Sequence, residues 1–218
     1  MSFVPLWING KHRSSGDGAT FDVCNPWTQD VVTKAASATL QDCEDAIVGA
    51  GEAFKTWEKT SIEERLRIFH ELAQLAQSEK YVDKVLEASD AETAFHRPSA
   101  LASGVILAGI INDAIQEVDL LKEEVVPSYI PGGKVHVQRR PLGVVYGMSP
   151  WNGGLTQAVR AVATPIFCGN TVVLRTSELS VRTHSIVTEL FKEVGSLYRF
   201  RLSLFNLGFT GGTSGWST

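Results

Sequence analysis

Two short β-branched runs in the second half of the chain, each followed by a helix-compatible segment, constrain the fold most. The runs cover 143–147 and 171–174, and the segments that follow cover 157–166 and 182–194. Strand and helix alternating at this spacing predict βαβ units around a parallel sheet. Open parallel sheets bind ligands beyond the carboxyl ends of their strands. The residues just after 147 and just after 174 are therefore the first candidates for a functional site.

The part before this alternation predicts short strands and then a layer of helices. Asn9-Gly10 follows a β-prone run and predicts a hairpin. Thr39 with Asp42 is a variant of the capping box and predicts a helix start. Apolar residues then recur with the period of a buried helix face. Helices are expected at 39–57, 61–75, 80–89 and 100–118.

A second hairpin is predicted where the helical pattern ends. Pro131-Gly132-Gly133 forms a tight turn, and Val135 and Val137 alternate with polar residues after it. The region 125–140 is therefore expected to form a β-hairpin arm.

The loop after the first run carries Met148, Ser149, Pro150, Trp151 and Asn152. Pro150 stiffens the loop, and the Trp151 side chain offers a flat apolar wall. The neutral amide of Asn152 can stabilise a developing oxyanion without titrating. Asn152 can equally cap the next helix, and spacing alone favours that alternative.

The loop after the second run carries Arg175 and Glu178. A carboxylate at this place can accept hydrogen bonds from both hydroxyls of a ribose, and it would repel a 2′-phosphate. The alternative is a helix start, with Thr176 or Ser177 as the cap and Glu178 in the first turn. The sequence alone does not separate these two interpretations.

Composition and charge exclude several classes of protein. The 218 residues are 44% hydrophobic and carry a formal net charge of -4, without a basic stripe. A nucleic-acid partner is not expected, because phosphate contacts need clustered Lys and Arg. The apolar run 101–111 is too short to span a bilayer, and the first residues do not resemble a secretory signal. Neither a membrane nor a metal site is expected, and the predicted location is the cytoplasm.

An ordered series of motifs resembles the aldehyde dehydrogenase superfamily. The series is Pro-Leu-Gly-Val-Val at 141–145, Pro-Trp-Asn at 150–152, Gly-Asn-Thr-Val-Val at 169–173 and Ser-Glu-Leu at 177–179. The run 177–184 is similar to the salicylaldehyde dehydrogenase-like branch. The motif Ala91-Glu92-Thr93 also fits, and the resemblance covers about residues 5–195. It implies a Rossmann-like sheet and NAD(P)-dependent oxidation of an aldehyde to a carboxylic acid.

Carried over position by position, the resemblance assigns roles to the two loops. Asn152 matches the amide that holds the oxyanion, and 148–151 line the path of the cofactor. Glu178 matches the carboxylate at the adenosine ribose, and Arg175 stands where the family usually has a lysine. The region 125–140 is similar to the family's oligomerisation arm. We therefore expect NAD in preference to NADP.

The resemblance weakens after residue 195. Gly211, Gly212 and Thr213 are similar to the family's phosphate-binding glycine-rich loop, but Gly212 stands at its serine position. A Gly/Ser/Thr-rich tail without function is the alternative. Together with Arg175, these departures predict impaired cofactor binding.

The three cysteines do not match the nucleophile that this oxidation needs. Cys24 lies in an early turn, and Cys168 precedes a strand as a packed residue. Cys43 lies among Asp42, Glu44 and Asp45, whose charges are expected to raise its pKa. The family's catalytic cysteine loop and glutamate motif have no counterpart, so the chain alone is expected to be inactive.

These observations predict an α/β fold with an incomplete Rossmann-like parallel sheet, an N-terminal helical layer and a β-hairpin arm. The expected divisions are 1–124 for the strands and helical layer, 125–140 for the arm, 141–195 for a partial dinucleotide-binding region and 196–218 for a divergent tail, with the catalytic domain absent. The chain is then a truncated aldehyde dehydrogenase-like protein. The alternatives are a non-enzymatic partner that docks through 125–140 onto a full-length aldehyde dehydrogenase, or a product without function.

Overall fold

The first hairpin owes its turn to Asn9 and Gly10. The computed structural model describes residues 2–94, 97–195 and 202–205. In the first hairpin, β2 (Leu6–Ile8) pairs antiparallel with β3 (Lys11–Arg13). The φ angles of Asn9 and Gly10 are 55° and 75°. A two-residue turn with both central φ angles positive matches the twist of the flanking strands. The predicted hairpin is confirmed.

The central sheet contains the predicted parallel strands. Its strand order is β3-β2-β10-β9-β8, and β8 (Val144–Met148), β9 (Thr171–Arg175) and β10 (Leu202–Phe205) run parallel. The connections are α6 (Gly154–Phe167) and α7 (Val181–Gly195). The predicted α/β fold with a Rossmann-like parallel sheet is confirmed, and β2 adds an antiparallel strand to it.

Strand β10 lies beyond residue 195, where the sequence analysis ended the βαβ region. Its backbone pairs with β9 on one side and with β2, from the first residues of the chain, on the other. This strand was not predicted, because its pairing partners are distant in sequence and the family resemblance ends before it. The parallel part of the sheet therefore extends past the expected boundary.

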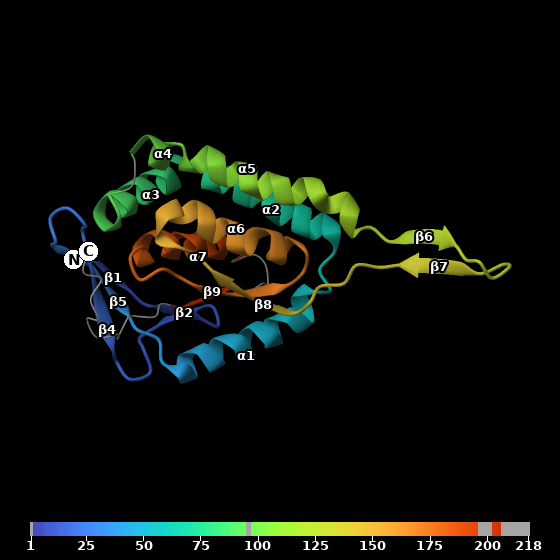
Figure 1. Cartoon of the computed structure of the whole chain (residues 1–218), viewed down its shortest axis with the longest axis horizontal. Helices are drawn as coiled ribbons and strands as arrows, with labels where there is room; N and C mark the ends of the chain where they lie inside the picture. Colours follow the sequence, from blue (N-terminus) through green and yellow to red (C-terminus); the bar gives the residue numbers. More distant parts are fainter. Residues whose placement is uncertain (1, 95–96, 196–201, 206–218) are drawn as a thin grey trace, which may run out of the picture.

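Helices cover both faces of the sheet in layers (Figure 1). One face is covered by α1 (Leu40–Trp57), and the other is covered by α6 and α7. An outer layer packs on α6 and α7, and it consists of α2 (Ile62–Ala76), α3 (Glu79–Glu92), α4 (Arg97–Leu101) and α5 (Ser103–Gln116). The single helix expected at 100–118 is wrong in detail, since Ala102 separates α4 from α5.

The core lies between the sheet and these helical layers. Phe69 of α2, Phe167 of α6 and Leu174 of β9 are at most 1% exposed, and the two phenylalanine rings meet edge to face at 5.0 Å. Burial of each such side chain stabilises the fold by about 1.5–3 kcal/mol. Trp57 at the end of α1 donates from Nε1 to the carbonyl of Ile166 at 3.0 Å, which ties α1 to the far end of α6.

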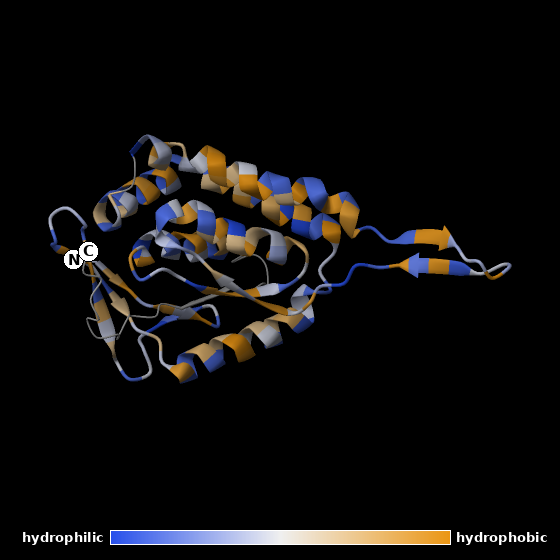
Figure 2. Ribbon diagram, in the orientation of Figure 1, coloured by the Kyte–Doolittle hydropathy of each residue, from blue (hydrophilic) through white to orange (hydrophobic). Residues whose placement is uncertain are grey.

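Two smaller sheets complete the fold. The first has the strand order β1-β5-β4, formed by Ser2–Val4, Val31–Ala36 and Thr20–Cys24. The second is the predicted arm, in which β6 (Glu124–Pro127) pairs with β7 (Lys134–Val137) after the 3-10 helix η1 (Glu117–Leu121). The arm extends away from the helical layers, and much of it is apolar (Figures 1 and 2). Among the described residues, no helix combines the length and apolarity needed to cross a bilayer.

Candidate functional site

The two loops named by the sequence analysis start side by side. Met148 pairs with Arg175 at the carboxyl ends of β8 and β9. One residue later, the Ser149 N–H donates to the Arg175 carbonyl at 3.1 Å. Both loops therefore leave the sheet at one edge, where open parallel sheets bind ligands.

Asn152 is exposed and does not cap a helix. It lies in the 3-10 turn η2 (Trp151–Gly153), and α6 starts at Gly154 after an N-cap residue, Gly153, that offers no side chain. The capping alternative is therefore wrong. The Asn152 amide makes no hydrogen bond within the described part of the chain, so its donors are available at the surface.

The neighbours of Asn152 differ in exposure. Met148 and Trp151 are 61% and 50% exposed, and Pro150 is exposed as well. These side chains form the surface of the loop. Ser149 is only 1% exposed, and its Oγ lies 3.3 Å from Nε2 of His184. Its side chain therefore supports the loop from the inside.

Glu178 lies outside the helix that follows it. Helix α7 begins at Val181, and the Ser177 Oγ accepts from the Leu179 N–H at 3.2 Å within a turn. The alternative that places Glu178 in the first turn of a helix is therefore wrong. The Glu178 carboxylate instead accepts from Arg175 at 3.2 Å, and the two side chains are 32% and 23% exposed.

A buried histidine joins the two loops. His184, in the first turn of α7, is fully buried. Its Nδ1 accepts from the Ser177 N–H at 3.3 Å, so its Nε2 carries the proton and faces the Gly154 carbonyl at 3.2 Å as well as Ser149. Burial lowers the pKa of His184 to about 4, against a weaker opposing effect of the Gly154 carbonyl. The imidazole is therefore neutral at physiological pH.

A buried glutamate supplies the N-terminal cap of α7. Glu92 of α3 is 2% exposed, and its carboxylate accepts from the backbone N–H groups of Arg182 and Thr183 at 2.8 and 2.9 Å and from the Thr183 Oγ1 at 3.0 Å. Burial raises the pKa of Glu92 in spite of these donors. A negative group at this end is favourable because it faces the positive pole of the helix. Glu92 therefore fixes where the second loop turns into α7.

The sequence analysis missed both His184 and Glu92 as functional side chains. Each lies within a motif that carried the family resemblance, His184 in the run 177–184 and Glu92 in Ala91-Glu92-Thr93. Membership of those motifs was the only signal, because neither residue follows a strand end. Gly211, Gly212 and Thr213, the predicted phosphate loop, lie outside the described residues.

The three cysteines lie apart from the loops in the fold. Cys24 is exposed at the end of β4, Cys43 lies in α1, and Cys168 lies in the turn before β9. Burial raises the pKa of Cys43, and the Asp42 carboxylate adds to this, so the predicted direction is confirmed with burial as the larger cause. Burial also raises the pKa of Cys168, against a weaker effect of the Arg65 guanidinium. Neither of these two thiols is activated as a nucleophile.

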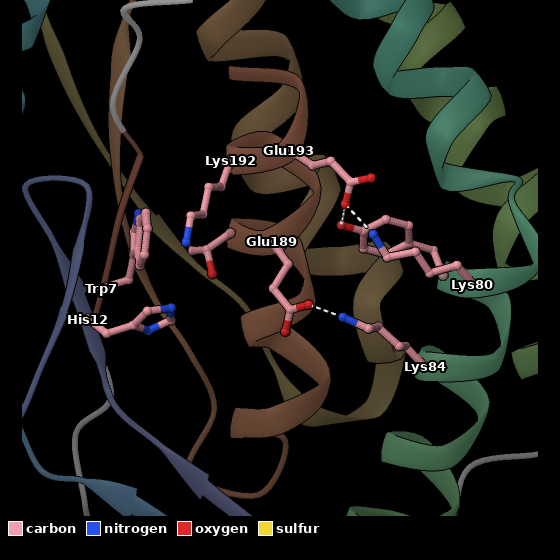
Figure 3. A pocket seen from close by; sticks show the side chains of 9 residues that line it. Trp7, His12, Lys80, Lys84, Glu189, Lys192 and Glu193 are labelled. Atoms are coloured by element: carbon pink, nitrogen blue, oxygen red, sulfur yellow. Dashed lines mark hydrogen bonds and ion pairs between the residues drawn. The ribbon is translucent and has the colours of Figure 1, made fainter. Parts of the chain in front are cut away.

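A cavity of about 460 Å³ lies elsewhere, between α3, the second half of α7 and the first hairpin (Figure 3). Its charged groups are largely paired with one another. Lys80 and Lys84 of α3 contact Glu193 and Glu189 of α7. The Lys192 ammonium lies 4.9 Å from the centre of the Trp7 ring. These contacts join the outer helical layer to α7, which is a structural role.

The sheet has helices on both faces, and polar side chains lie beyond the ends of two adjacent parallel strands. These features place the protein in the class of open-sheet α/β proteins, which bind ligands at that edge of the sheet. The model of the aldehyde dehydrogenase family matches residues 12–196. The chain therefore belongs to the aldehyde dehydrogenase family.

Similar proteins cover nearly the whole chain. A vanillin dehydrogenase of Pseudomonas fluorescens is 35% identical over 194 residues, which are 88% of this chain and 39% of that protein. The crystal structure of a salicylaldehyde dehydrogenase from Pseudomonas putida G7, complexed with salicylaldehyde, superimposes with a TM-score of 0.88 at 31% identity and covers 95% of this chain and 42% of that one. A betaine aldehyde dehydrogenase from Staphylococcus aureus in complex with NAD+ gives a TM-score of 0.86 at 25% identity over 94% of this chain and 41% of that one. The chain thus spans about two fifths of the length of these relatives.

Proposed function

We propose that the chain forms a nicotinamide dinucleotide site of an aldehyde dehydrogenase and uses the edge beyond β8 and β9 for it. The observation that carries this proposal is the pair of adjacent loops that present Trp151 and Asn152 on one side and Arg175 and Glu178 on the other. One relative of known structure, the betaine aldehyde dehydrogenase at 25% identity, is described in complex with NAD+ in two of its point-mutant structures.

Each exposed side chain has a separate part in this proposal. The Glu178 carboxylate, at the end of β9, accepts the hydroxyl hydrogens of the adenosine ribose. The exposed Met148 and Trp151 side chains provide apolar surface for the cofactor. The Asn152 amide donates to the oxygen of a reacting aldehyde as negative charge develops there. The bound nicotinamide supplies the hydride acceptor, which no side chain of the loops provides.

The cofactor is proposed to be NAD in preference to NADP. An ionised Glu178 repels a 2′-phosphate and accepts from two ribose hydroxyls. Arg175 already donates to this carboxylate at 3.2 Å. Binding of the ribose therefore has to share the Glu178 oxygens with Arg175, which supports the expectation of weakened binding.

Glu178→Gln tests the cofactor site directly. Hydrogen bonds to a charged group contribute about 1.5–3 kcal/mol, so we expect the affinity for NAD to fall by about tenfold or more. Isothermal titration with NAD and with NADP measures the change, and the preference for NAD over NADP should shrink in the variant. Glu189→Gln, which makes the same change in the second half of α7, away from both loops, serves as the control. Equal NAD affinity in wild type and Glu178→Gln would contradict the proposed role.

The reaction served by this site is proposed to be oxidation of an aldehyde to a carboxylic acid. Two relatives named for vanillin and salicylaldehyde are 34–36% identical to this chain, which favours an aromatic aldehyde. The chain by itself should not turn over, because none of its three cysteines lies in the loops after β8 and β9, and burial raises the pKa of Cys43 and Cys168. An assay of the purified chain with NAD and salicylaldehyde or vanillin should show no NADH. NADH formation would refute this part of the proposal.

Association through the arm is a second proposal, carried by its exposure. All eight strand residues of β6 and β7 are exposed, and Tyr129 and Ile130 in the connecting turn are 97% and 56% exposed. Exposed apolar surface on a projecting hairpin favours contact with another chain, either a second copy or a full-length aldehyde dehydrogenase.

A further inference from the structure

The two loops of the proposed cofactor site have few direct links to each other. One link is the backbone hydrogen bond from Ser149 to Arg175. A second is the hydrogen bond that the Ser180 Oγ donates to the Trp151 carbonyl at 3.4 Å. Among the described residues, His184 is the one whose ring bonds to both loops. Its Nδ1 takes the Ser177 N–H, while its Nε2 faces Ser149 and Gly154.

These partners flank the proposed binding residues on both sides. Ser149 and Gly154 stand before and after the Trp151–Asn152 turn, and Ser177 immediately precedes Glu178. Three of the groups that His184 contacts are the Ser177 amide, the Gly154 carbonyl and the Ser149 hydroxyl, and all lie in the buried interior. Movement of either loop would leave at least one buried polar group unpaired, which is costly.

We propose that His184 is a positioning residue, which holds the Trp151–Asn152 turn and Glu178 at a fixed separation and so preorganises the dinucleotide site. This inference rests on the proposed function. A site that is preorganised loses less freedom when the ligand binds, so its affinity is higher. His184 contacts no ligand in this account, because it is fully buried beneath both loops.

His184→Leu removes both hydrogen-bonding nitrogens and keeps an apolar side chain at a buried position. We expect its affinity for NAD, measured by isothermal titration, to fall by about tenfold or more. His184→Asn places Oδ1 where Nδ1 lies and keeps the Ser177 link, so it should recover part of the loss. This partial rescue separates positioning from simple loss of packing.

Val187→Ala is the matched control. Val187 is fully buried one turn along α7, within the main core, so its truncation destabilises the protein away from the loops. Urea unfolding measures the stability of all variants. The proposal is overturned if Val187→Ala weakens NAD binding as much as His184→Leu does at similar loss of stability, or if His184→Asn binds no better than His184→Leu.

Amide hydrogen exchange without any ligand separates this inference from the proposed function. His184→Leu should accelerate exchange in 148–154 and 176–180 by about tenfold or more relative to α7, and Val187→Ala should not. Unchanged exchange in these two segments would overturn the positioning role. If the two variants differ in exchange in this way but the wild-type protein does not bind NAD, the proposed function fails while the positioning role of His184 stands.

Discussion

Burial of the His184 imidazole makes the stability of the folded protein depend on pH. The pKa of a histidine in an unfolded chain is near 6.5, and burial lowers that of His184 to about 4 in the folded protein. Above pH 6.5 the residue is neutral in both states and has no effect on stability. As the pH falls from 6.5 to 4, the unfolded chain takes up a proton that the folded protein does not, so stability is lost.

The expected loss from this residue is about 3 kcal/mol at pH 4 relative to pH 7. His184→Gln lacks the titrating group and should show a flatter dependence of the unfolding free energy on pH between 6.5 and 4. Urea unfolding of both proteins at several pH values in this window measures the difference. Parallel curves for the two proteins would show that His184 does not titrate as described.

The sequence identified two residues of the candidate site but did not predict their contact with each other or their place relative to the helices. The motifs pointed to Arg175 and Glu178, and the structure pairs them at 3.2 Å. Sequence alone left two alternatives open, a helix cap for Asn152 and a place in the first turn of a helix for Glu178, because Asn and Glu occur at helix starts as well as in sites. The structure decides this through the start of α6 at Gly154 and of α7 at Val181.

Helix α1 contacts the first hairpin at Gly49, a position that has no side chain. A Cβ at Gly49 would lie 1.5 Å from Oδ1 of Asn9, while a Cβ at Gly51 would meet only Val144 Cγ2, at 4.0 Å. Helix α1 therefore packs on the hairpin turn through Gly49. Both glycines lie within the same helix, so they can be compared directly.

Gly49→Ala should destabilise the protein by about 1–2 kcal/mol, because overpacking of about 1–3 kcal/mol exceeds the gain in helix propensity. Gly51→Ala should stabilise it by up to about 1 kcal/mol. Urea unfolding measures both values. The double variant Asn9→Gly/Gly49→Ala should recover stability, since glycine adopts the φ of 55° at position 9 readily. Destabilisation by Gly51→Ala equal to that by Gly49→Ala would argue against the contact.

Elements that depend on neighbouring residues were the easiest to predict. The capping box of Thr39 and Asp42 is present with both hydrogen bonds, and it starts α1 where expected. Strand β10 and the cap that Glu92 gives to α7 depend on partners about 30 and 90 residues away. No local pattern encodes such partners, so the sequence could not place them.

For the molecule as a whole, the arm is a projecting surface, since all strand residues of β6 and β7 are exposed. It extends away from the helical layers (Figure 1), and an isolated two-stranded hairpin is at best marginally stable in water. The register Val126↔Val135 and Glu124↔Val137 places three valines on one face of the arm, because side chains alternate along a strand. The pair Val125↔His136 lies on the opposite face.

If the arm mediates association, the face with three valines should carry it. Val126→Glu with Val135→Lys replaces a cross-strand apolar pair by opposite charges, which keeps the two strands compatible while removing apolar surface. Burial of each exposed valine contributes on the order of 1 kcal/mol, so self-association should weaken by about tenfold or more. Sedimentation velocity over a range of protein concentrations measures this.

Val125→Glu with His136→Lys makes a similar change on the opposite face and should leave the association state unchanged. If the wild-type protein stays monomeric at every concentration, the arm does not mediate self-association, and a different chain is left as its partner. If both double variants weaken self-association equally, association does not depend on one face of the arm.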